Sequence, residues 1–267
     1  MPITPLAARY DHFLLDLDGT VWVGGEPTEG AVEAVTALRA AFKNIAYVTN
    51  DTQLGTEEYV RKLWRLGFQA SLEEVVTAGG ALQYVLAARF AGASAVVIGS
   101  AAVHNHVEAA GLRLVNHTAF ASRADVVVVA YHPQFHYDEL RDASQAALRG
   151  AYLIGLNRDA TFPMPDGLWP GSGAVLAAVE TASSRTADIV GKPEPVLVQT
   201  ALDRLGPGRA LMIGDRVDAD LGAAHAAGID GAIVLSGASD RARAEAATDP
   251  SPVAISERLA TLLLAGA

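Results

Sequence analysis

The sequence of 267 residues contains no cysteine, which excludes a disulfide framework, a zinc–thiolate site and a cysteine nucleophile. No segment approaches the roughly 18 uninterrupted apolar residues of a membrane-spanning helix, and the N-terminus lacks the basic-then-apolar layout of a secretory signal. Basic residues are in the minority, since 20 lysines and arginines accompany 30 acidic residues for a net charge of −10. That balance disfavours a general binder of nucleic acid or anionic membranes, and we expect a cytoplasmic protein.

Short apolar runs alternate with alanine-rich segments that have helical periodicity. Several runs are apolar at every position, as parallel strands covered on both faces are. The predicted strands are residues 12–18, 44–50, 94–100, 125–131, 151–157, 210–215 and 231–237. The segments between them space their apolar residues at three and four, as amphipathic helices do. These predicted helices are residues 29–42, 56–68, 79–92, 101–112, 137–150, 172–184, 194–206 and 218–229.

This alternation predicts an α/β fold with a Rossmann-like, doubly wound parallel sheet and right-handed crossovers. The segments 75–82 and 183–195 look like joints, and they bracket a stretch with its own strands and helices. We therefore predict a core domain of residues 1–77 and 187–267, and an inserted α/β domain of residues 78–186.

Polar side chains follow three predicted strands at the point where each strand ends. Asp16 and Asp18 end the first, Asp215 ends another, and Thr49 begins a polar group at the end of a third. In an open α/β sheet, ligands bind outside the carboxyl ends of the strands. Neighbouring carboxylates repel each other, and Mg²⁺ takes carboxylate, water and phosphate oxygens. The pattern predicts a magnesium site with one aspartate available as a nucleophile for phosphoryl transfer.

An isolated Asp-x-Asp is also typical of a turn or a helix N-cap. The two other polar strand ends favour the ligand-binding interpretation, and Lys192 supports it. Lys192 opens the predicted helix over residues 194–206, where the helix dipole disfavours a cation, so it needs an anionic partner. Bound phosphate together with Asp16 would provide one; a solvent-exposed lysine before a proline is the alternative.

Four segments, in this order, resemble the four motifs of the haloacid-dehalogenase-like hydrolases: DLDGT (16–20), VTN (48–50), GKPEP (191–195) and GDRVDAD (214–220). Residues 157–180 are similar to the subgroup of para-nitrophenyl-phosphate, phosphoglycolate, glycerol-phosphate and pyridoxal-phosphate phosphatases and nucleotide monophosphatases. In that subgroup a large α/β cap lies between the second and third motifs, where the inserted domain is predicted. The likeness spans nearly the whole chain.

The resemblance implies a role for each matching residue. Asp16 resembles the nucleophile that forms an aspartyl-phosphate, and Asp18 resembles the general acid and base. Thr49 resembles the phosphate-binding hydroxyl, assisted by the backbone near Asn50, and Lys192 resembles the residue that steadies Asp16 and the phosphate charge. Dehalogenating members lack an acid two residues after the nucleophile, so the resemblance favours phosphate esters.

The metal ligands also follow from the resemblance. Asp16, Asp215 and the backbone carbonyl of Asp18 would hold Mg²⁺. Asp220 matches the second acidic position of the fourth motif, near the metal or the lysine. Asp218 lies between the motif acids and is expected at a helix start.

Two residues with predicted substrate contacts allow more than one interpretation. Asp51 stands where many subgroup members have asparagine, and a carboxylate near phosphate repels it by about 1 kcal/mol or more. Asp51 therefore faces away, meets a positive substrate group or holds a loop. Arg158 would meet an anionic substrate; the alternative is a surface pair with Asp159.

Other residues receive structural interpretations. His104 and His106 are two apart in a predicted helix and point to different faces, which disfavours a metal pair. Core packing is expected for Trp22, Trp64 and Trp169.

The sequence thus predicts a Mg²⁺-dependent phosphatase that hydrolyses a small phosphorylated metabolite through an aspartyl-phosphate. The alternative is a non-catalytic phosphometabolite sensor on the same fold, which has no need of the acid/base Asp18. We expect no nucleic-acid or membrane partner, and the subgroup resemblance allows a homodimer through the cap. Which phosphate ester is the substrate does not follow from the sequence.

Overall fold

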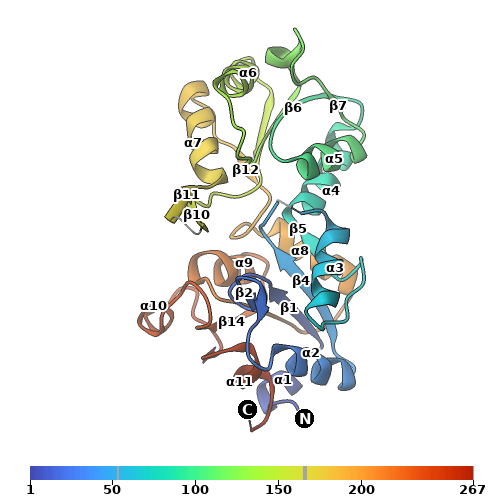
Figure 1. Ribbon diagram of the computed structural model, residues 1–267, viewed down its shortest axis with the longest axis vertical. Coiled ribbons are helices and arrows are strands. Elements are labelled where there is room, and N and C mark those ends of the chain that lie inside the picture. Colours follow the sequence, from blue (N-terminus) through green and yellow to red (C-terminus); the bar gives the residue numbers. More distant parts are fainter. Residues whose placement is uncertain (53, 165–166, 267) are drawn as a thin grey trace. The chain divides into compact units, whose positions relative to one another are not determined.

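A computed structural model describes residues 1–52, 54–164 and 167–266 of the chain. The chain divides into two compact units (Figure 1). The core unit consists of Met1–Thr49, Thr56–Val76 and Lys192–Ala267, and the inserted unit of Asn50–Gly55 and Thr77–Gly191. Each unit carries its own parallel sheet with helices on both faces, so the predicted α/β fold class is confirmed.

The core unit is built on a six-stranded sheet of order β15-β14-β13-β1-β4-β5. Central strand β1 pairs in parallel with β13 and β4, and the parallel pairing continues from β13 to β14 and β15. β1 and β13 are buried at every position, which explains their lack of polar–apolar alternation. The strands are β1 His12–Asp16, β4 Asn44–Thr49, β5 Val75–Thr77, β13 Ala210–Gly214, β14 Asp230–Val234 and β15 Ile255–Ser256.

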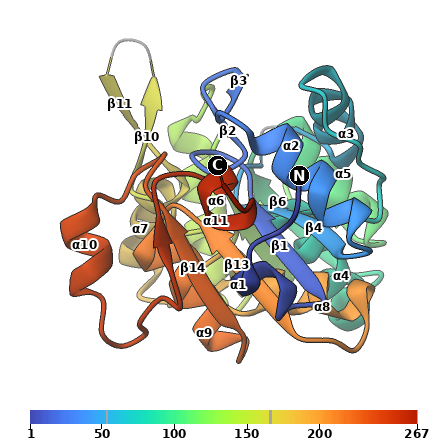
Figure 2. The same ribbon diagram turned by 90° about the horizontal axis from the view of Figure 1, so that it is seen from below.

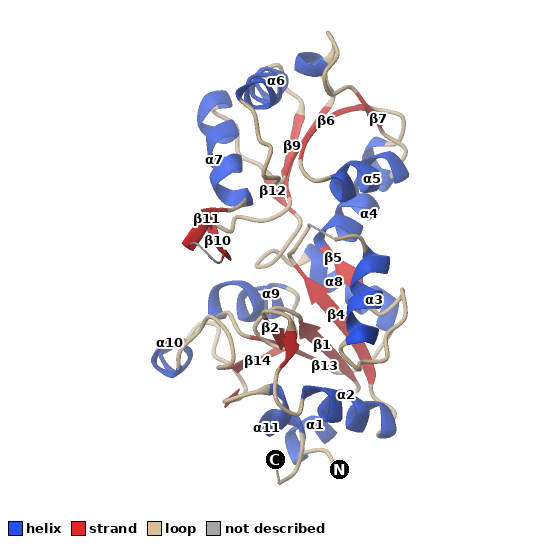
Figure 3. Ribbon diagram, in the orientation of Figure 1, coloured by secondary structure: helices blue, strands red, loops and turns tan. Residues whose placement is uncertain are grey.

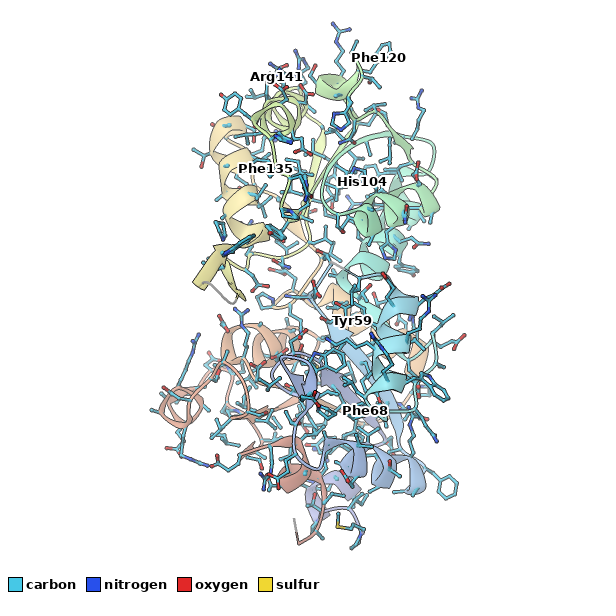
Figure 4. All side chains as sticks on the ribbon, in the orientation of Figure 1. Tyr59, Phe68, His104, Phe120, Phe135 and Arg141 are labelled. Carbon is cyan, nitrogen blue, oxygen red and sulfur yellow. The ribbon has the colours of Figure 1, made fainter. Side chains whose placement is uncertain are left out.

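Helices cover both faces of this sheet. Figure 2 shows α2 and α11 on one face and α8 and α9 on the other. The helices are α1 Pro5–Ala8, α2 Ala31–Ala40, α3 Thr56–Arg65, α8 Val196–Leu205, α9 Gly222–Ala226, α10 Arg241–Ala246 and α11 Leu259–Leu263. A short hairpin of β2 Trp22–Val23 and β3 Glu26–Pro27 follows β1. In the apolar interior, Phe68, labelled in Figure 4, sets its ring edge-on to Tyr47 with the centroids 6.5 Å apart.

The inserted unit has a five-stranded sheet of order β12-β9-β8-β6-β7, parallel throughout. Helices α4 and α5 cover one face, and α6 and α7 the other (Figure 3). Its strands are β6 Ser94–Ile98, β7 Arg113–Leu114, β8 Val126–Val129, β9 Tyr152–Gly155 and β12 Asp188–Ile189. Its helices are α4 Ala78–Phe90, α5 Ala101–Ala109, α6 Tyr137–Leu148 and α7 Ser172–Ser183, with a 3₁₀ turn at Ala121–Arg123 and a hairpin of β10 Thr161–Met164 and β11 Gly167–Pro170.

The first predicted joint contains the boundary between the two units, after Val76, and it also contains β5 and the start of α4, since a three-residue strand gives too short a pattern to recognise. Two local predictions differ from the structure. The helix predicted over residues 218–229 begins as one π-helical turn, Val217–Leu221, before α9. Trp64 is 61% exposed instead of packing in the core; its indole N–H donates to the carbonyl of Ala70. Within the described residues, no helix has the length and apolar character needed to span a bilayer.

Candidate active site

Three buried polar side chains lie at the carboxyl edge of the core sheet. Asp16 ends β1 and lies opposite Val48 of β4 in the parallel register, so Thr49 is the next residue along that edge. Asp215 follows β13 directly. Exposure is 7% for Asp16, 2% for Thr49 and 4% for Asp215, so the side chains are removed from water as well as close to the sheet edge. The sheet topology therefore brings together groups that the sequence places far apart.

Lys192 is buried beside two of the carboxylates. Its ammonium donates hydrogen bonds to Oδ1 of Asp16 and, over 2.6 Å, to Oδ1 of Asp220. Burial lowers the pKa of Lys192, but the charges of Asp16 and Asp220 outweigh it and hold the pKa above its usual value. Helix α8 begins at Val196, so Lys192 lies just ahead of the helix whose N-terminal end it was expected to open. The anionic partners that the sequence required are the two aspartates.

Asp220 is fixed through both of its carboxylate oxygens. Oδ1 accepts from Lys192, and Oδ2 accepts from the backbone N–H of Arg216 over 2.9 Å. A Cβ atom on Gly214 would lie 2.1 Å from Cγ of Asp220, so the carboxylate fits only against a glycine. The neighbouring acid, Asp218, is exposed and pairs with Arg216 instead. The π-helical turn thus aims Asp220 inward and Asp218 outward.

Asp215 is held in a cradle of two glycines and a backbone amide. The N–H of Ala238 donates to its Oδ2 over 2.6 Å. A Cβ atom would lie 2.4 Å from that same oxygen at Gly19 and 2.0 Å from it at Gly237. Gly19 also has a φ of +89°, a conformation that glycine adopts without strain. Sequence reasoning missed Gly237 and Ala238; the small residues that follow β14 are the only signal there.

Burial and crowding perturb these acids strongly. One carboxylate oxygen each from Asp16, Asp215 and Asp220 lies within 4.8 Å of the others. Burial raises the pKa of Asp215 to about 6, with Asp220 adding to the effect. Burial also raises the pKa of Asp16 well above its usual value; Lys192 opposes this, while Asp220 and Asp215 reinforce it. The pKa values are raised mainly because the carboxyl groups are buried, and the single lysine does not offset that effect.

The donor set fits a hard divalent cation. Ionised Asp16, Asp215 and Asp220 carry three negative charges against the single positive charge of Lys192, which leaves two negative charges uncompensated. All the donors are carboxylate oxygens, which suit Mg²⁺ better than a softer metal. Because both oxygens of Asp220 already accept from protein donors, Asp16 and Asp215 are the carboxylates that remain for an ion.

Asp18 lies outside this buried group. Its side chain is exposed, and Oδ1 accepts a hydrogen bond from Nε1 of Trp22 over 2.7 Å. Trp22 is completely buried, in line with the expected core packing. Its indole also hydrogen-bonds to Asp18, an acid of the first motif. A carboxyl group at the solvent side of the site can exchange protons, whereas the buried aspartates cannot do so as freely.

The other predicted contacts belong to the inserted unit. Asn157, itself buried, donates from Nδ2 to the carbonyl of Asn50 over 3.2 Å, and Asp51 is half-buried in the loop after β4. Arg158 makes a two-pronged pair with Glu180 of α7, at 2.9 and 2.8 Å, a partner that neither the expected substrate contact nor the alternative pair with Asp159 included. The hydrogen bonds from Arg158 lower the pKa of Glu180. Arg158 therefore links the chain segment that follows β9 to helix α7.

Two family models match the chain. The one described as haloacid dehalogenase-like hydrolase matches residues 13–113, and the one described as HAD-hydrolase-like matches residues 189–262. The first match contains Asp16, Asp18 and Thr49; the second contains Lys192 and Asp215. The matches thus cover all four motif segments, whereas residues 157–180 lie between them.

Similar proteins are phosphatases by name. The chain is 37% identical to D-glycerol 3-phosphate phosphatase of Mycobacterium tuberculosis, over 87% of this chain and 65% of that protein's length. It is 34% identical to human glycerol-3-phosphate phosphatase, over 88% of this chain and 81% of that protein. The crystal structure of the Mycobacterium tuberculosis glycerol phosphate phosphatase in complex with magnesium superposes with a TM-score of 0.89 at 36% identity, covering 97% of this chain and 78% of that one.

Proposed function

The chain belongs to the haloacid dehalogenase-like hydrolases, and from this premise we propose that it is a Mg²⁺-dependent phosphatase of small organic phosphate monoesters. The observation that carries the proposal is the buried group of Asp16, Asp215, Asp220 and Lys192, with Asp18 two residues after Asp16. The phosphatases to which the chain is similar support an enzyme instead of a non-catalytic sensor.

In the first step, a carboxylate oxygen of Asp16 attacks the phosphorus atom. A bond forms between that oxygen and phosphorus while the bond from phosphorus to the leaving oxygen breaks. The leaving oxygen keeps the bonding electron pair and takes a proton from Asp18. The products are an alcohol and an aspartyl-phosphate on Asp16.

In the second step, water attacks the phosphorus atom of the aspartyl-phosphate. Asp18, now ionised, removes a proton from that water, so one residue serves as acid and then as base. The bond between phosphorus and Asp16 breaks, inorganic phosphate leaves, and both aspartates return to their starting state. The exposure of Asp18 suits this role, because its proton must be exchanged in every cycle.

Lys192 and Thr49 position the reacting groups. Lys192 holds Oδ1 of Asp16 and presents positive charge where negative charge develops on the phosphoryl oxygens. Asp220 keeps the ammonium in place from its other side. Thr49, buried at the end of β4, and the backbone near Asn50 are assigned to phosphate binding.

Mg²⁺ would be held by Asp16, Asp215 and the backbone carbonyl of Asp18. When bound, the ion neutralises the two uncompensated negative charges and offsets the charge of the phosphoryl group. We assign Asp220 to Lys192 instead of the metal, since both of its oxygens accept from the protein.

The substrate class is a small phosphorylated metabolite, and glycerol phosphate is the first candidate because two similar enzymes carry it in their names. Asp51 and Arg158 are proposed substrate-side residues, although the pair between Arg158 and Glu180 favours a bracing role for the arginine. Residues 78–186 as a substrate-selecting cap, the cytoplasmic location, the homodimer and the absence of nucleic-acid and membrane partners stay predictions.

Release of inorganic phosphate from para-nitrophenyl phosphate and glycerol 3-phosphate, with Mg²⁺ and then with EDTA, tests the proposal. We expect turnover only with the metal, no turnover by Asp16→Asn, and a phosphoenzyme detectable by intact mass after acid quenching. Asp218→Asn is the matched control, because it removes a charge from the same loop as Asp220 at an exposed position. Binding of phosphate esters without any release would identify a sensor instead.

A further inference from the structure

The indole of Trp22 contacts Asp18, the residue assigned above as acid and base. Nε1 of Trp22 donates to Oδ1 of Asp18 over 2.7 Å, and the tryptophan is completely buried while the aspartate is exposed. We propose that Trp22 is a positioning residue that fixes which oxygen of Asp18 carries the catalytic proton. This inference rests on the proposed phosphatase function.

The backbone between the two residues is rigidly folded. The carbonyl of Leu17 accepts from the N–H groups of Val21 and Trp22, at 2.9 and 3.1 Å. In return, the N–H of Gly19 donates to the carbonyl of Trp22 over 2.7 Å. These bonds close a tight loop that fixes the main chain at both ends of the side-chain contact. The hydrogen bond from the indole then restrains the rotation of the Asp18 carboxyl group.

An indole N–H can donate a hydrogen bond but cannot accept one. The oxygen of Asp18 that faces Trp22 is therefore an acceptor and cannot hold its proton toward the ring. In the protonated acid, Oδ1 is the carbonyl oxygen and Oδ2 carries the proton. Trp22 thus selects Oδ2 as the oxygen that protonates the leaving group in the first step and removes the proton from water in the second.

Lys62 reinforces this contact from a face of the indole ring. Its ammonium, on helix α3, lies 4.0 Å from the centroid of the Trp22 ring. A cation over an aromatic face is attracted by the ring electrons and polarises them. A polarised indole is a stronger N–H donor, as in other chains of linked polar interactions. Lys62 therefore acts on Asp18 through Trp22.

The proposal predicts a selective loss that depends on the leaving group. An alkoxide must be protonated as it departs, whereas para-nitrophenolate is a stable anion and departs without a proton. A misplaced acid therefore slows cleavage of glycerol 3-phosphate and leaves cleavage of para-nitrophenyl phosphate nearly unchanged. The ratio of the kcat/KM values for the two substrates measures this selective loss. The constant kcat/KM reports only the steps up to and including the first irreversible one, which is the departure of the leaving group.

Trp22→Phe keeps an aromatic ring but removes the donor. We expect about 10-fold to 100-fold lower kcat/KM for glycerol 3-phosphate and less than about 3-fold for para-nitrophenyl phosphate. Replacement of Trp22 by 3-benzothienylalanine, in which sulfur takes the place of the N–H, should reproduce the loss with the indole shape retained. Lys62→Met, at a half-buried position outside the core, should change the ratio in the same direction by a smaller factor.

Trp64→Phe is the matched control. Trp64 lies on the same helix as Lys62, and its indole N–H also donates, but to a backbone carbonyl. Its removal should leave the ratio of the two kcat/KM values unchanged. An equal loss for both substrates in the Trp22 and Lys62 variants, or no loss, would overturn the proposal. Failure of the phosphatase function itself is distinguishable, because the wild-type protein would then turn over neither substrate.

Discussion

The Lys192 ammonium is held by Asp220 over 2.6 Å, and Asp220 is itself anchored by the backbone of Arg216. This relationship makes Asp220 a support for the lysine, since the pair is almost completely buried, with side-chain exposures of 3% and 2%. Removing one partner of a buried pair leaves an uncompensated charge, which is far more costly than losing a surface pair.

Asp220→Ala should therefore destabilise the fold by about 3 kcal/mol and lower kcat, because Lys192 loses its second anchor. Chemical denaturation and phosphate release measure the two effects. Asp218→Asn should change stability by no more than about 0.5 kcal/mol, since its pair with Arg216 is exposed. Equal effects of the two substitutions would contradict the assignment of Asp220.

Mg²⁺ should raise the melting temperature by relieving repulsion between buried carboxylates. At 100 times its Kd, a ligand that binds only the folded state adds about 2.7 kcal/mol of stability. Asp215→Asn should abolish this shift, and in EDTA the variant should melt above the wild-type protein because one buried charge has gone. Differential scanning calorimetry with and without the metal checks both statements. If Mg²⁺ raised the melting temperature of Asp215→Asn as much as that of the wild-type protein, Asp215 would be excluded as a ligand.

Gly237→Ala should damage the metal site without changing any ligand. The new Cβ atom would lie 2.0 Å from Oδ2 of Asp215, so the carboxylate must move away from the Ala238 amide. We expect a Mg²⁺ affinity at least 10-fold weaker, as for the loss of other supports around metal ligands; isothermal titration measures it. Gly80→Ala is the control, because its Cβ meets only an ordinary contact at 3.5 Å, and it should leave the affinity unchanged.

The stability of the inserted unit should depend on the ionisation of Asp125. Hydrogen bonds from the Ser94 hydroxyl and N–H, at 2.6 and 2.8 Å, lower the pKa of Asp125 below its usual value. Ionised Asp125 thus stabilises the folded unit at pH values above its pKa in the unfolded chain. This stabilisation is lost as the pH falls through its lower pKa in the folded unit. Because Asp125 is exposed and screened by solvent, Asp125→Asn should cost no more than about 1 kcal/mol at pH 7, and the difference from wild type should shrink below about pH 4.

Denaturant titrations at pH 7, 4 and 3 measure that difference for the Asp125 variant. Asp138→Asn serves as the control, since Asp138 is exposed on α6 and pairs only with a surface arginine in the contacts described. Its effect should be small at every pH. A constant difference for Asp125→Asn down to pH 3 would contradict the coupling to ionisation.

Arg158→Met distinguishes bracing from substrate binding. Because Arg158 is paired with Glu180 through two hydrogen bonds, the substitution should lower stability by about 1 kcal/mol and change KM by less than about 2-fold. Glu180→Gln should lower stability similarly, since it weakens the same contact. A large rise in KM for Arg158→Met alone would restore the predicted substrate role.

The parallel-sheet fold and the gathering of Asp16, Thr49 and Asp215 could be predicted from the sequence. Apolar runs that end in polar residues define strands, and the topology of an open sheet places their carboxyl ends together. Lys192 could also be predicted as a cation that needs an anion, and Asp16 and Asp220 are its partners. These predictions succeeded because each depends on a local pattern or on a general rule of sheet topology.

The remaining features depend on contacts that no local pattern reports. Gly237 matters only because Asp215, from another strand, lies 2.0 Å from its missing Cβ. Trp22 looked like any buried aromatic, and its hydrogen bond to Asp18 follows from the tight loop between them. Strands of two residues, such as β2 and β12, are too short to show a periodicity.

The order of the strands has a consequence for synthesis on the ribosome. Strand β1 lies between β4 and β13, and β13 is translated only after the whole inserted unit. The nascent core sheet therefore has one side of its central strand unpaired until β13 emerges, while the inserted unit already has every strand of its own sheet. Since Lys192 and Asp215 also follow the inserted unit, the growing chain carries Asp16, the proposed nucleophile, long before it carries the groups that surround it, and the buried site can assemble only after β13 has been translated.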